Sequence, residues 1–290
     1  MEAANTPASD QPVTVIEPVR GWRLPDFREF WRYRDLLVVL ARRDIVVRYK
    51  QAIFGPGWAV LQPLLVAGMF AFFLGIITDT TEILPDQDLP YGAFAVAGIV
   101  LWLAFATGVN MSALSTVMSS MLIEKVYFPR LMIPIAAVAP AAVDMVIGMF
   151  VAIAVAIGFG VVPDARVLLA PFVLLLALSL AVGLGIFLSA LNVRYRDTTM
   201  LVNFVLLAGL FITPITYPYE LFVSQFPAAL EPIYALNPMV GVLELFRWCL
   251  LGTPLPNLAV LAVPFVAAPV FLVAGVLYFE RSQRGFADVI

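Results

Sequence analysis

Long uncharged stretches alternate with short charged segments along the chain. Most of these stretches can cross the ~30 Å hydrocarbon layer as a helix, which takes about 20 apolar residues. The pattern therefore predicts an all-α integral membrane protein, because a helix satisfies its own backbone hydrogen bonds inside lipid. We expect six transmembrane helices, at Trp58–Thr78, Ala93–Ser115, Leu131–Phe159, Val167–Leu191, Thr199–Thr216 and Asn257–Phe279.

The same pattern divides the chain into three regions. Residues 1–24 are polar, contain several prolines and lack the apolar core of a signal peptide, so we expect a disordered cytoplasmic tail. Residues 25–54 are predicted to form an amphipathic interface helix region. Residues 55–290 are predicted to form the six-span transmembrane domain.

The N-terminal helix is predicted to lie in the membrane surface. From Pro25 to Ala41 apolar residues recur at spacings of three and four, with most arginines on another face, as in interfacial helices. An ordinary soluble helix packed on another element is the alternative. The residues expected to form this interface helix and the point where the chain enters the membrane are Phe30, Trp31, Arg42, Arg43, Arg48, Tyr49, Lys50, Gly55, Pro56 and Trp58.

A sharp bend is expected at Gly55-Pro56-Gly57, between the basic segment and the first span. Proline lacks an N–H and disfavours helical geometry in the residue before it, yet suits the first turn of a new helix. Trp58 follows directly, and indole prefers the headgroup level of the bilayer. The chain is therefore predicted to turn from the membrane surface into the membrane here.

The distribution of basic residues predicts the orientation. Of the 17 Lys and Arg residues, only Arg166 and Arg247 fall on one side of the six-span arrangement. Cytoplasmic segments carry the excess of Lys and Arg, so both termini are expected in the cytoplasm. That orientation requires an even number of spans.

The segment from Tyr217 to Pro256 bears on the number of spans, because Ile233–Gly252 is apolar enough to suggest a seventh span. Spanning would place Glu244 and Arg247 in lipid at a cost of a few kcal/mol each. They lie three residues apart and can pair on one helix face. We expect short re-entrant or interfacial helices on the outer face.

Composition agrees with a polytopic membrane protein: 62% of residues are hydrophobic, 13% are charged, and mean hydropathy is +0.97. The sequence has no His and one Cys, which excludes His-based metal sites, Ser-His-Asp triads and an internal disulfide. It has no phosphate-binding P-loop and no Gly-rich phosphate loop. Catalytic residues and resident cofactors are not expected, and energy must come from a partner or an ion gradient.

Several groups of polar or charged residues could carry chemistry. Asp144 is the ionisable residue inside a predicted span; it is either a helix–helix hydrogen-bond anchor near a helix bend at Pro140 or part of an ion pathway. The acids Asp79, Glu82, Asp86 and Asp88 are expected in a solvated outer loop. In the loop between spans two and three, charged residues lie beside aromatic ones, which suits docking on a soluble partner. A simple turn is equally consistent. The docking candidates in this loop are Glu124, Lys125, Tyr127, Phe128 and Arg130.

Aromatic residues inside the spans could line a conduit for sugar rings, although phenylalanines in spans usually pack on lipid or on neighbouring helices. The conduit candidates are Phe70, Phe73, Trp102, Phe105, Phe204 and Phe211. Gly183 and Gly185 are better explained as positions of close helix packing than as chemistry.

The sequence also resembles a known family. The runs RRDIVVRYKQAIFGPGWAVLQPLL, EKVYFPR, NVRYRD, NPM and FADVI, in this order, are similar to the permease subunit of polysaccharide-exporting type-2 ABC transporters, which move O-antigen, capsule and teichoic acid chains. The resemblance covers Asp26 to Ile290. Gly57 departs from it, because the family usually has a larger apolar residue before the tryptophan.

The resemblance implies a role for each region. The segment Asp26–Lys50 corresponds to the gate helix, and Glu124–Arg130 lies in or beside the coupling helix. Tyr217–Pro256 matches paired helices near the extracellular gate, which implies that Glu244 and Arg247 are an outer gate pair. It also implies a complex of two permeases and two cytoplasmic ATPases in the bacterial inner membrane, with ATP and Mg bound by the ATPase. A lipid-linked polysaccharide would then cross between two copies of this chain, with no nucleic acid as a partner.

Two other transport functions remain open at this stage. One is a type-2 ABC permease for a drug or another lipid. The other, from a different class, is an ion-coupled secondary transporter, which predicts internal repeats and several buried charges. A membrane enzyme acting on lipid-linked sugar would need clustered acids or a metal site.

Overall fold

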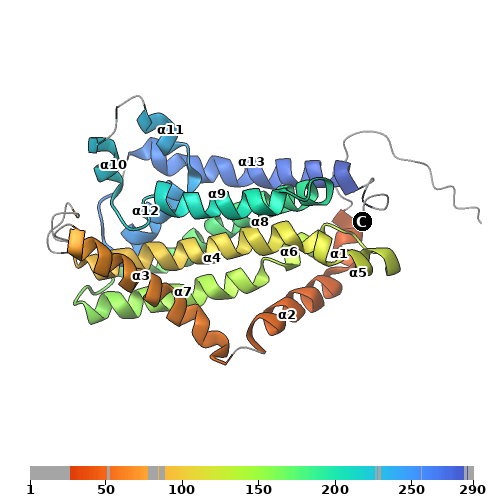
Figure 1. Cartoon of the computed structure of the whole chain (residues 1–290), viewed down its shortest axis with the longest axis horizontal. Helices are drawn as coiled ribbons and strands as arrows, with labels where there is room; N and C mark the ends of the chain where they lie inside the picture. The colour runs from red at the N-terminus through yellow and green to blue at the C-terminus, as the bar shows by residue number, and fades with distance from the viewer. Residues whose placement is uncertain are drawn as a thin grey trace, which may run out of the picture.

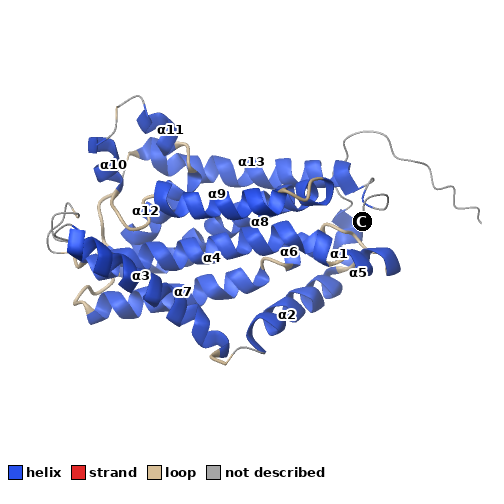
Figure 2. Cartoon of the chain, in the orientation of Figure 1, coloured by secondary structure: helices blue, strands red, loops and turns tan. Residues whose placement is uncertain are grey.

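The computed structural model describes residues 27–50, 53–77, 84, 89–225, 227, 230–255, 257–283 and 286. Within these residues every regular element is a helix (Figure 2), as the sequence predicted. The predicted tail 1–24, the acids Asp79, Glu82, Asp86 and Asp88 of the first outer loop, and most of the C-terminal FADVI run lie outside the described residues.

The chain order of the helices is shown in Figure 1. They are α1 (Phe27–Arg32), α2 (Arg34–Lys50), the 3-10 turn η1 (Gly55–Gly57), α3 (Trp58–Ile77), α4 (Tyr91–Met118), α5 (Ser120–Lys125), α6 (Met132–Ala136), α7 (Ala139–Gly158), the 3-10 turn η2 (Ala165–Leu169), α8 (Ala170–Arg194), α9 (Thr198–Ile212), α10 (Tyr219–Gln225), α11 (Glu231–Ala235), α12 (Pro238–Leu251) and α13 (Leu258–Ser282).

Five helical segments within the described residues are long and apolar enough to cross a membrane. They are Gly55–Leu74, Tyr91–Met118, Met132–Gly158, Ala165–Arg194 and Leu258–Ser282, which correspond to predicted spans one, two, three, four and six. The third contains a turn at Ala137 and Val138, and Pro140 lies in the first turn of α7. The bend expected near this proline is therefore present.

The predicted fifth span is shorter than expected. α9 has 15 residues and ends at Ile212, not at Thr216. At 1.5 Å per residue it is about 22 Å long, which falls short of the hydrocarbon layer. Pro214 explains the early end, because the residue before a proline avoids helical geometry.

The core is built around α4. In its most apolar window 78% of residues are buried, against 11% for the segment that contains α3. α8 packs against both α4 and α13, and α7 covers another side of α4. α3 is therefore a peripheral helix with a largely exposed surface.

Glycines allow the closest of these helix contacts, as predicted for Gly183 and Gly185. A Cβ atom on Gly183 would lie 2.6 Å from the backbone nitrogen of Leu272 on α13, and one on Gly185 would lie 2.5 Å from the Ser112 side chain on α4. Larger residues would force α8 away from both neighbours.

The two ends of the bundle differ in what they hold. α1, α5 and the last turn of α13 border a common groove at one end, which we call the α5 end. α10 and α11 lie at the opposite end, the α10 end (Figure 1). The N-terminal region, the loop after span two and the last described turn of the chain thus share one end, as the distribution of basic residues requires.

α2 and α3 leave the compact bundle and meet at an elbow (Figure 1). α2 contacts α6 and α7, while α3 contacts α4 and α7. This arrangement places the basic helix beside the bundle and holds its C-terminal end close to the membrane-spanning helices.

Candidate transport site

A charged contact ties the end of α2 to the bundle. The Arg48 Nη2 atom donates to the Asp144 carboxylate on α7 at 2.6 Å, and the Tyr49 hydroxyl donates to the other carboxylate oxygen. The Asp144 side chain is 9% exposed and that of Arg48 is 29% exposed. Asp144 is therefore an anchor between helices, one of its two predicted roles, and its partners come from the basic segment of the chain.

The surface of α2 has one side against the bundle and one exposed side. α1 and α2 are separated at Tyr33, and Val38 on the exposed side of α2 is 63% exposed. Leu40 is buried against the bundle, while exposed valines and the exposed Arg42 and Arg43 share the opposite face. An apolar surface that faces lipid is also exposed in the isolated chain, so the interfacial placement of this helix stays a prediction.

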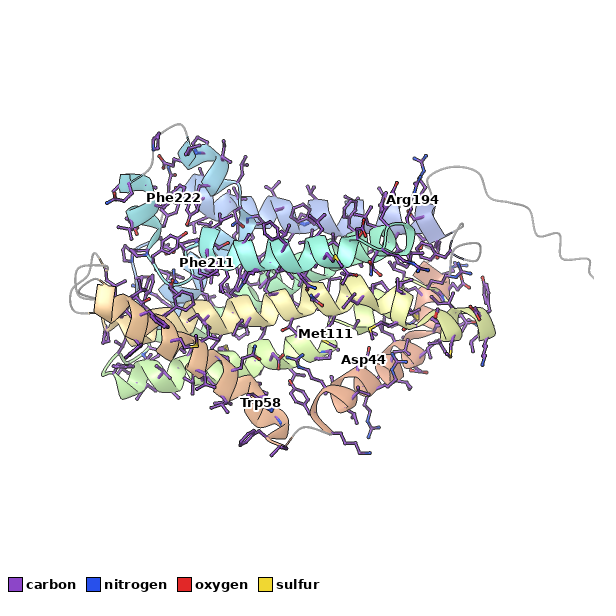
Figure 3. All side chains as sticks on the ribbon, viewed as in Figure 1. Asp44, Trp58, Met111, Arg194, Phe211 and Phe222 are labelled. Atoms are coloured by element: carbon purple, nitrogen blue, oxygen red, sulfur yellow. The ribbon has the colours of Figure 1, made fainter. Side chains whose placement is uncertain are left out.

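The elbow itself is the bend that was predicted. Gly55 has φ +49°, a backbone conformation that side chains other than glycine rarely adopt, and the 3-10 turn Gly55–Gly57 leads directly into α3. Trp58 is the first residue of α3 and stacks edge-on against Phe54, with ring centroids 5.4 Å apart. Both rings are exposed on the elbow, where Figure 3 labels Trp58.

The loop after α4 lines a groove of about 500 Å³ at the α5 end. α1 contributes Glu29 and Phe30, the end of α13 contributes Glu280 and Gln283, and the loop contributes all five docking candidates. Tyr127 is 79% exposed, and the Glu29 carboxylate beside it raises the pKa of its phenol. Glu124 and Lys125 are also exposed.

Two of the docking candidates serve the fold of the loop instead of its surface. Phe128 is only 5% exposed, and Arg130 Nη1 donates to the Gln283 carbonyl at the end of α13 at 2.7 Å. Of the two aromatic candidates, the Tyr127 ring is accessible to a partner and the Phe128 ring is buried, and docking at this loop stays a prediction.

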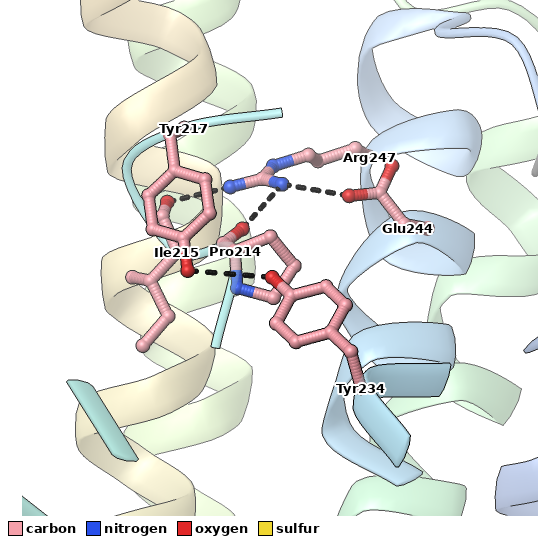
Figure 4. Close-up of polar contacts among 6 residues, drawn as sticks. All are labelled: Pro214, Ile215, Tyr217, Tyr234, Glu244 and Arg247. Carbon is pink, nitrogen blue, oxygen red and sulfur yellow. Dashed lines mark hydrogen bonds and ion pairs between the residues drawn. The ribbon is translucent and has the colours of Figure 1, made fainter. Parts of the chain in front are cut away.

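Glu244 and Arg247 pair on α12, as their spacing predicted. Arg247 Nη1 donates to the Glu244 carboxylate at 3.0 Å, and both side chains are almost fully buried (Figure 4). α12 packs against α4, α8 and α13, so it lies within the bundle and not on its surface. The re-entrant or interfacial placement of this segment in the membrane stays a prediction.

Arg247 also donates hydrogen bonds to the non-helical backbone that follows α9. It donates to the carbonyls of Pro214 and Ile215 at 2.7 and 2.5 Å, and its guanidinium lies 3.6 Å from the centre of the Phe94 ring. The unwound backbone after α9 thus gains hydrogen bonds that a helix would have supplied. Gly98 on α4 permits this approach, since a Cβ there would lie 2.1 Å from the Ile215 carbonyl oxygen.

The six aromatic conduit candidates fall into separate environments. Phe105 is buried in the core beside Trp102, so it faces no open surface. Phe73 and Phe204 are exposed on α3 and α9. The exposed Phe211 lies 6.3 Å from Phe70, ring centre to ring centre, and borders an apolar groove of about 550 Å³ at the α10 end.

A further groove of about 400 Å³ lies between α4 and α9. Trp102, Asn110 and Asn203 contribute to its lining, and Arg48 from α2 lies at its edge. Sequence reasoning did not single out the two asparagines. Each asparagine is a polar side chain inside an apolar predicted span, and this could have drawn attention to both. Nothing in the sequence, however, placed the two amides together.

Comparison of the sequence with known proteins identifies the family of this chain. The sequence profile of the ABC-2 type transporter family matches residues 35–251, from the start of α2 to the end of α12. The chain belongs to the ABC-2 type transporter family. It is a multi-pass permease-type membrane protein, and the family members it resembles are membrane subunits of transporters.

Individual relatives match the chain over nearly its full length. An O-antigen export system permease protein RfbA of Myxococcus xanthus is 28% identical over 264 residues, which cover 91% of this chain and 98% of that protein. A protein of the same name from Klebsiella pneumoniae is 25% identical over 257 residues, 88% of this chain and 95% of that protein. The resemblance inferred from the sequence runs is therefore confirmed at the level of the family.

Proposed function

We propose that this chain is the transmembrane subunit of an ATP-driven exporter that moves a lipid-linked polysaccharide across the bacterial inner membrane. The observation that carries the proposal is the match to O-antigen export permeases over 95–98% of their own length. That match includes the basic α2, the elbow and the buried α12, and is not confined to the apolar spans. The polymer class is thus supported by the parts of the chain that composition alone does not constrain.

ATP hydrolysis is assigned to a separate chain. The sequence contains no phosphate-binding loop, so a cytoplasmic ATPase with its own ATP and Mg is the proposed energy source. The α5 end offers the docking surface, since Tyr127, Glu124 and Lys125 are exposed beside the 500 Å³ groove. We expect two permeases and two ATPases in the complex.

A second copy of the chain is proposed to complete the conduit. α3 and α9 expose Phe72, Phe73, Phe204 and Phe211, and α9 makes few contacts beyond α4 and α8. Lipid could cover such a surface, but a path for a hydrophilic polymer requires protein on both sides of it. The surface formed by these two helices is where we place the partner copy.

The test is to express the chain with its chromosomal neighbours, purify it in mild detergent and identify what co-purifies. An ABC ATPase at about one copy per permease, together with loss of surface polysaccharide when the permease gene is deleted, is the expected result. Surface polysaccharide that stays at the wild-type level in the deletion strain would refute polysaccharide export. An intact complex without an ATPase would refute the ABC mechanism.

Orientation is tested separately with a reporter fused after Ile290. We expect activity of a cytoplasmic reporter such as green fluorescent protein, and no activity of alkaline phosphatase at the same position. The opposite result would mean that α12 crosses the membrane and that the chain has an odd number of spans.

An ion-coupled carrier is less well supported. Such a carrier needs a carboxylate that can exchange protons or cations, whereas Asp144 is occupied by Arg48 and Tyr49. A type-2 permease for a drug or another lipid would share the fold, and the deletion experiment separates it from a polysaccharide exporter.

A further inference from the structure

Two amides face each other in the groove between α4 and α9. The Asn110 side-chain N–H donates to the Asn203 side-chain carbonyl, and Asn203 is exposed while Asn110 is half-buried. Asn110 lies well inside α4, eight residues before its end at Met118. Both residues therefore occupy segments that the hydropathy pattern places in the membrane.

This pair leaves hydrogen-bonding capacity unused. Each asparagine amide has two N–H donors and one carbonyl acceptor, and the mutual bond uses one donor and one acceptor. Three N–H groups and the Asn110 carbonyl therefore remain, and within the described part of the chain these two amides have no other hydrogen-bond partner. Amide groups at membrane depth are costly without partners, so a group from outside this chain, such as a ligand in the groove, must meet them.

The rest of the lining favours a neutral ligand with both hydroxyl and apolar faces. Arg48 supplies the groove's positive charge, but its guanidinium is already paired with Asp144 and also contacts the Met111 sulfur at 3.8 Å. Figure 3 labels Met111 on α4 close to α2. A phosphate would have to compete with that carboxylate, whereas a hydroxyl needs only the amides.

Apolar side chains form the remainder of the groove. Trp102 lies toward its α10 side, and Leu206, Leu207 and Leu210 of α9 line it along its length. Gly209 brings α9 against the indole, since a Cβ there would lie 2.6 Å from the Trp102 ring. A sugar ring matches this combination, because its C–H faces can pack on apolar side chains while its hydroxyls bond the amides.

We propose that Asn110 and Asn203 form a subsite that binds the hydroxyl groups of a neutral sugar unit of the transported chain, at the part of the groove nearest the α5 end. The inference rests on the proposed function and assigns these residues to it. The alternative is a purely structural role, in which the pair acts as a clamp that only holds α4 against α9. A clamp would use one hydrogen bond and would not require the amides to border an open groove.

The direct test uses a photo-reactive residue in the otherwise unchanged chain, in cells that carry the whole transporter. Leu207 is 59% exposed and lines the groove, so benzoylphenylalanine replaces it there; Val266 on α13, 63% exposed, is the matched control position. After illumination, the purified permease is probed with a lectin or antibody against the cell's own surface polysaccharide. We expect a glycan adduct at position 207 and none at position 266.

The outcomes separate the subsite from the proposed function. If the position 207 strain exports polysaccharide and yields only phospholipid adducts, or none, the subsite is refuted while the export function stands. If deletion of the permease gene leaves surface polysaccharide at the wild-type level, the proposed function has failed and the subsite with it. A glycan adduct of equal strength at both positions would also refute a localised subsite.

Substitution provides the second test. Asn203→Leu and Asn110→Leu each remove amide groups that face the groove, and the loss of one hydrogen bond of ordinary strength corresponds to about a fivefold drop in export rate per residue. Ser179→Ala is the control, because the Ser179 hydroxyl is exposed on α8 and bonds its own helix at the Leu175 carbonyl. Export within twofold of wild type in the double variant would overturn the proposal.

The conservative variant Asn203→Gln distinguishes a sugar contact from a clamp. It keeps every donor and acceptor but moves them by one methylene, so glycan cross-linking at position 207 should recover in part while thermal stability changes little. A clamp predicts the reverse, in which stability falls in all Asn variants and the amount of glycan adduct per folded permease stays constant.

Discussion

The attachment of α2 to the bundle yields a sharp prediction. Asp144→Ala removes both contacts that hold the C-terminal end of α2, the ion pair with Arg48 and the hydrogen bond from Tyr49. Breaking a fully buried pair by removing one partner costs about 3–5 kcal/mol. Arg48 retains 29% exposure and can turn toward water, so we expect a smaller cost of about 2–3 kcal/mol for holding α2 against α7.

Such a cost changes the equilibrium between attached and detached α2 by about 30- to 160-fold. Hydrogen exchange measured by mass spectrometry on the purified complex reports this opening directly. We expect amides near the end of α2, around Arg48, to exchange faster by that factor, while amides of the central helix α4 keep their wild-type rates. The acceleration should be confined to α2 and the elbow.

Two further variants make the test specific. Arg34→Ala is the control, since Arg34 pairs with its neighbour Asp35 at 3.8 Å on an exposed part of the same helix and does not reach α7. The double variant Arg48→Leu/Asp144→Leu should lose less protection than the sum of the single changes, because two apolar side chains can replace a buried pair. Exchange of α2 at the wild-type rate in Asp144→Ala would refute the reasoning.

Three other outcomes follow from the same geometry. Arg247→Ala leaves the Glu244 carboxylate and two backbone carbonyls without their donor, so unfolding should become easier by about 3–5 kcal/mol, and an unchanged melting temperature would contradict this. Gly183→Ala should lower the melting temperature by several degrees through its 2.6 Å clash, whereas Gly158→Ala, with open space around it, should not; equal effects would rule out the packing role. Tyr127→Ala should weaken ATPase binding in a pull-down and leave thermal stability unchanged. Phe128→Ala should instead destabilise the fold by about 3 kcal/mol, as measured by thermal unfolding.

Hydropathy and local chemistry were sufficient for much of the architecture. The starts of α3 and α13 lie within one residue of the predicted ones, because prolines shortly before each start break the preceding segment and suit the opening of a new helix. The elbow followed from Gly55 and Pro56, whose backbone preferences are local. The pairing of Glu244 with Arg247 followed from their spacing on one helix.

Contacts between distant parts of the chain could not be deduced in this way. Arg48 and Asp144 are separated by 96 residues, and Asn110 and Asn203 by 93, so only the packing of α2, α4, α7 and α9 brings each pair together. Burial of Phe128 likewise depends on how its loop folds, whereas the early end of α9 has a local cause in Pro214. Periodicity reports which residues share a face of one helix, whereas the partner of that face depends on the packing of the whole bundle.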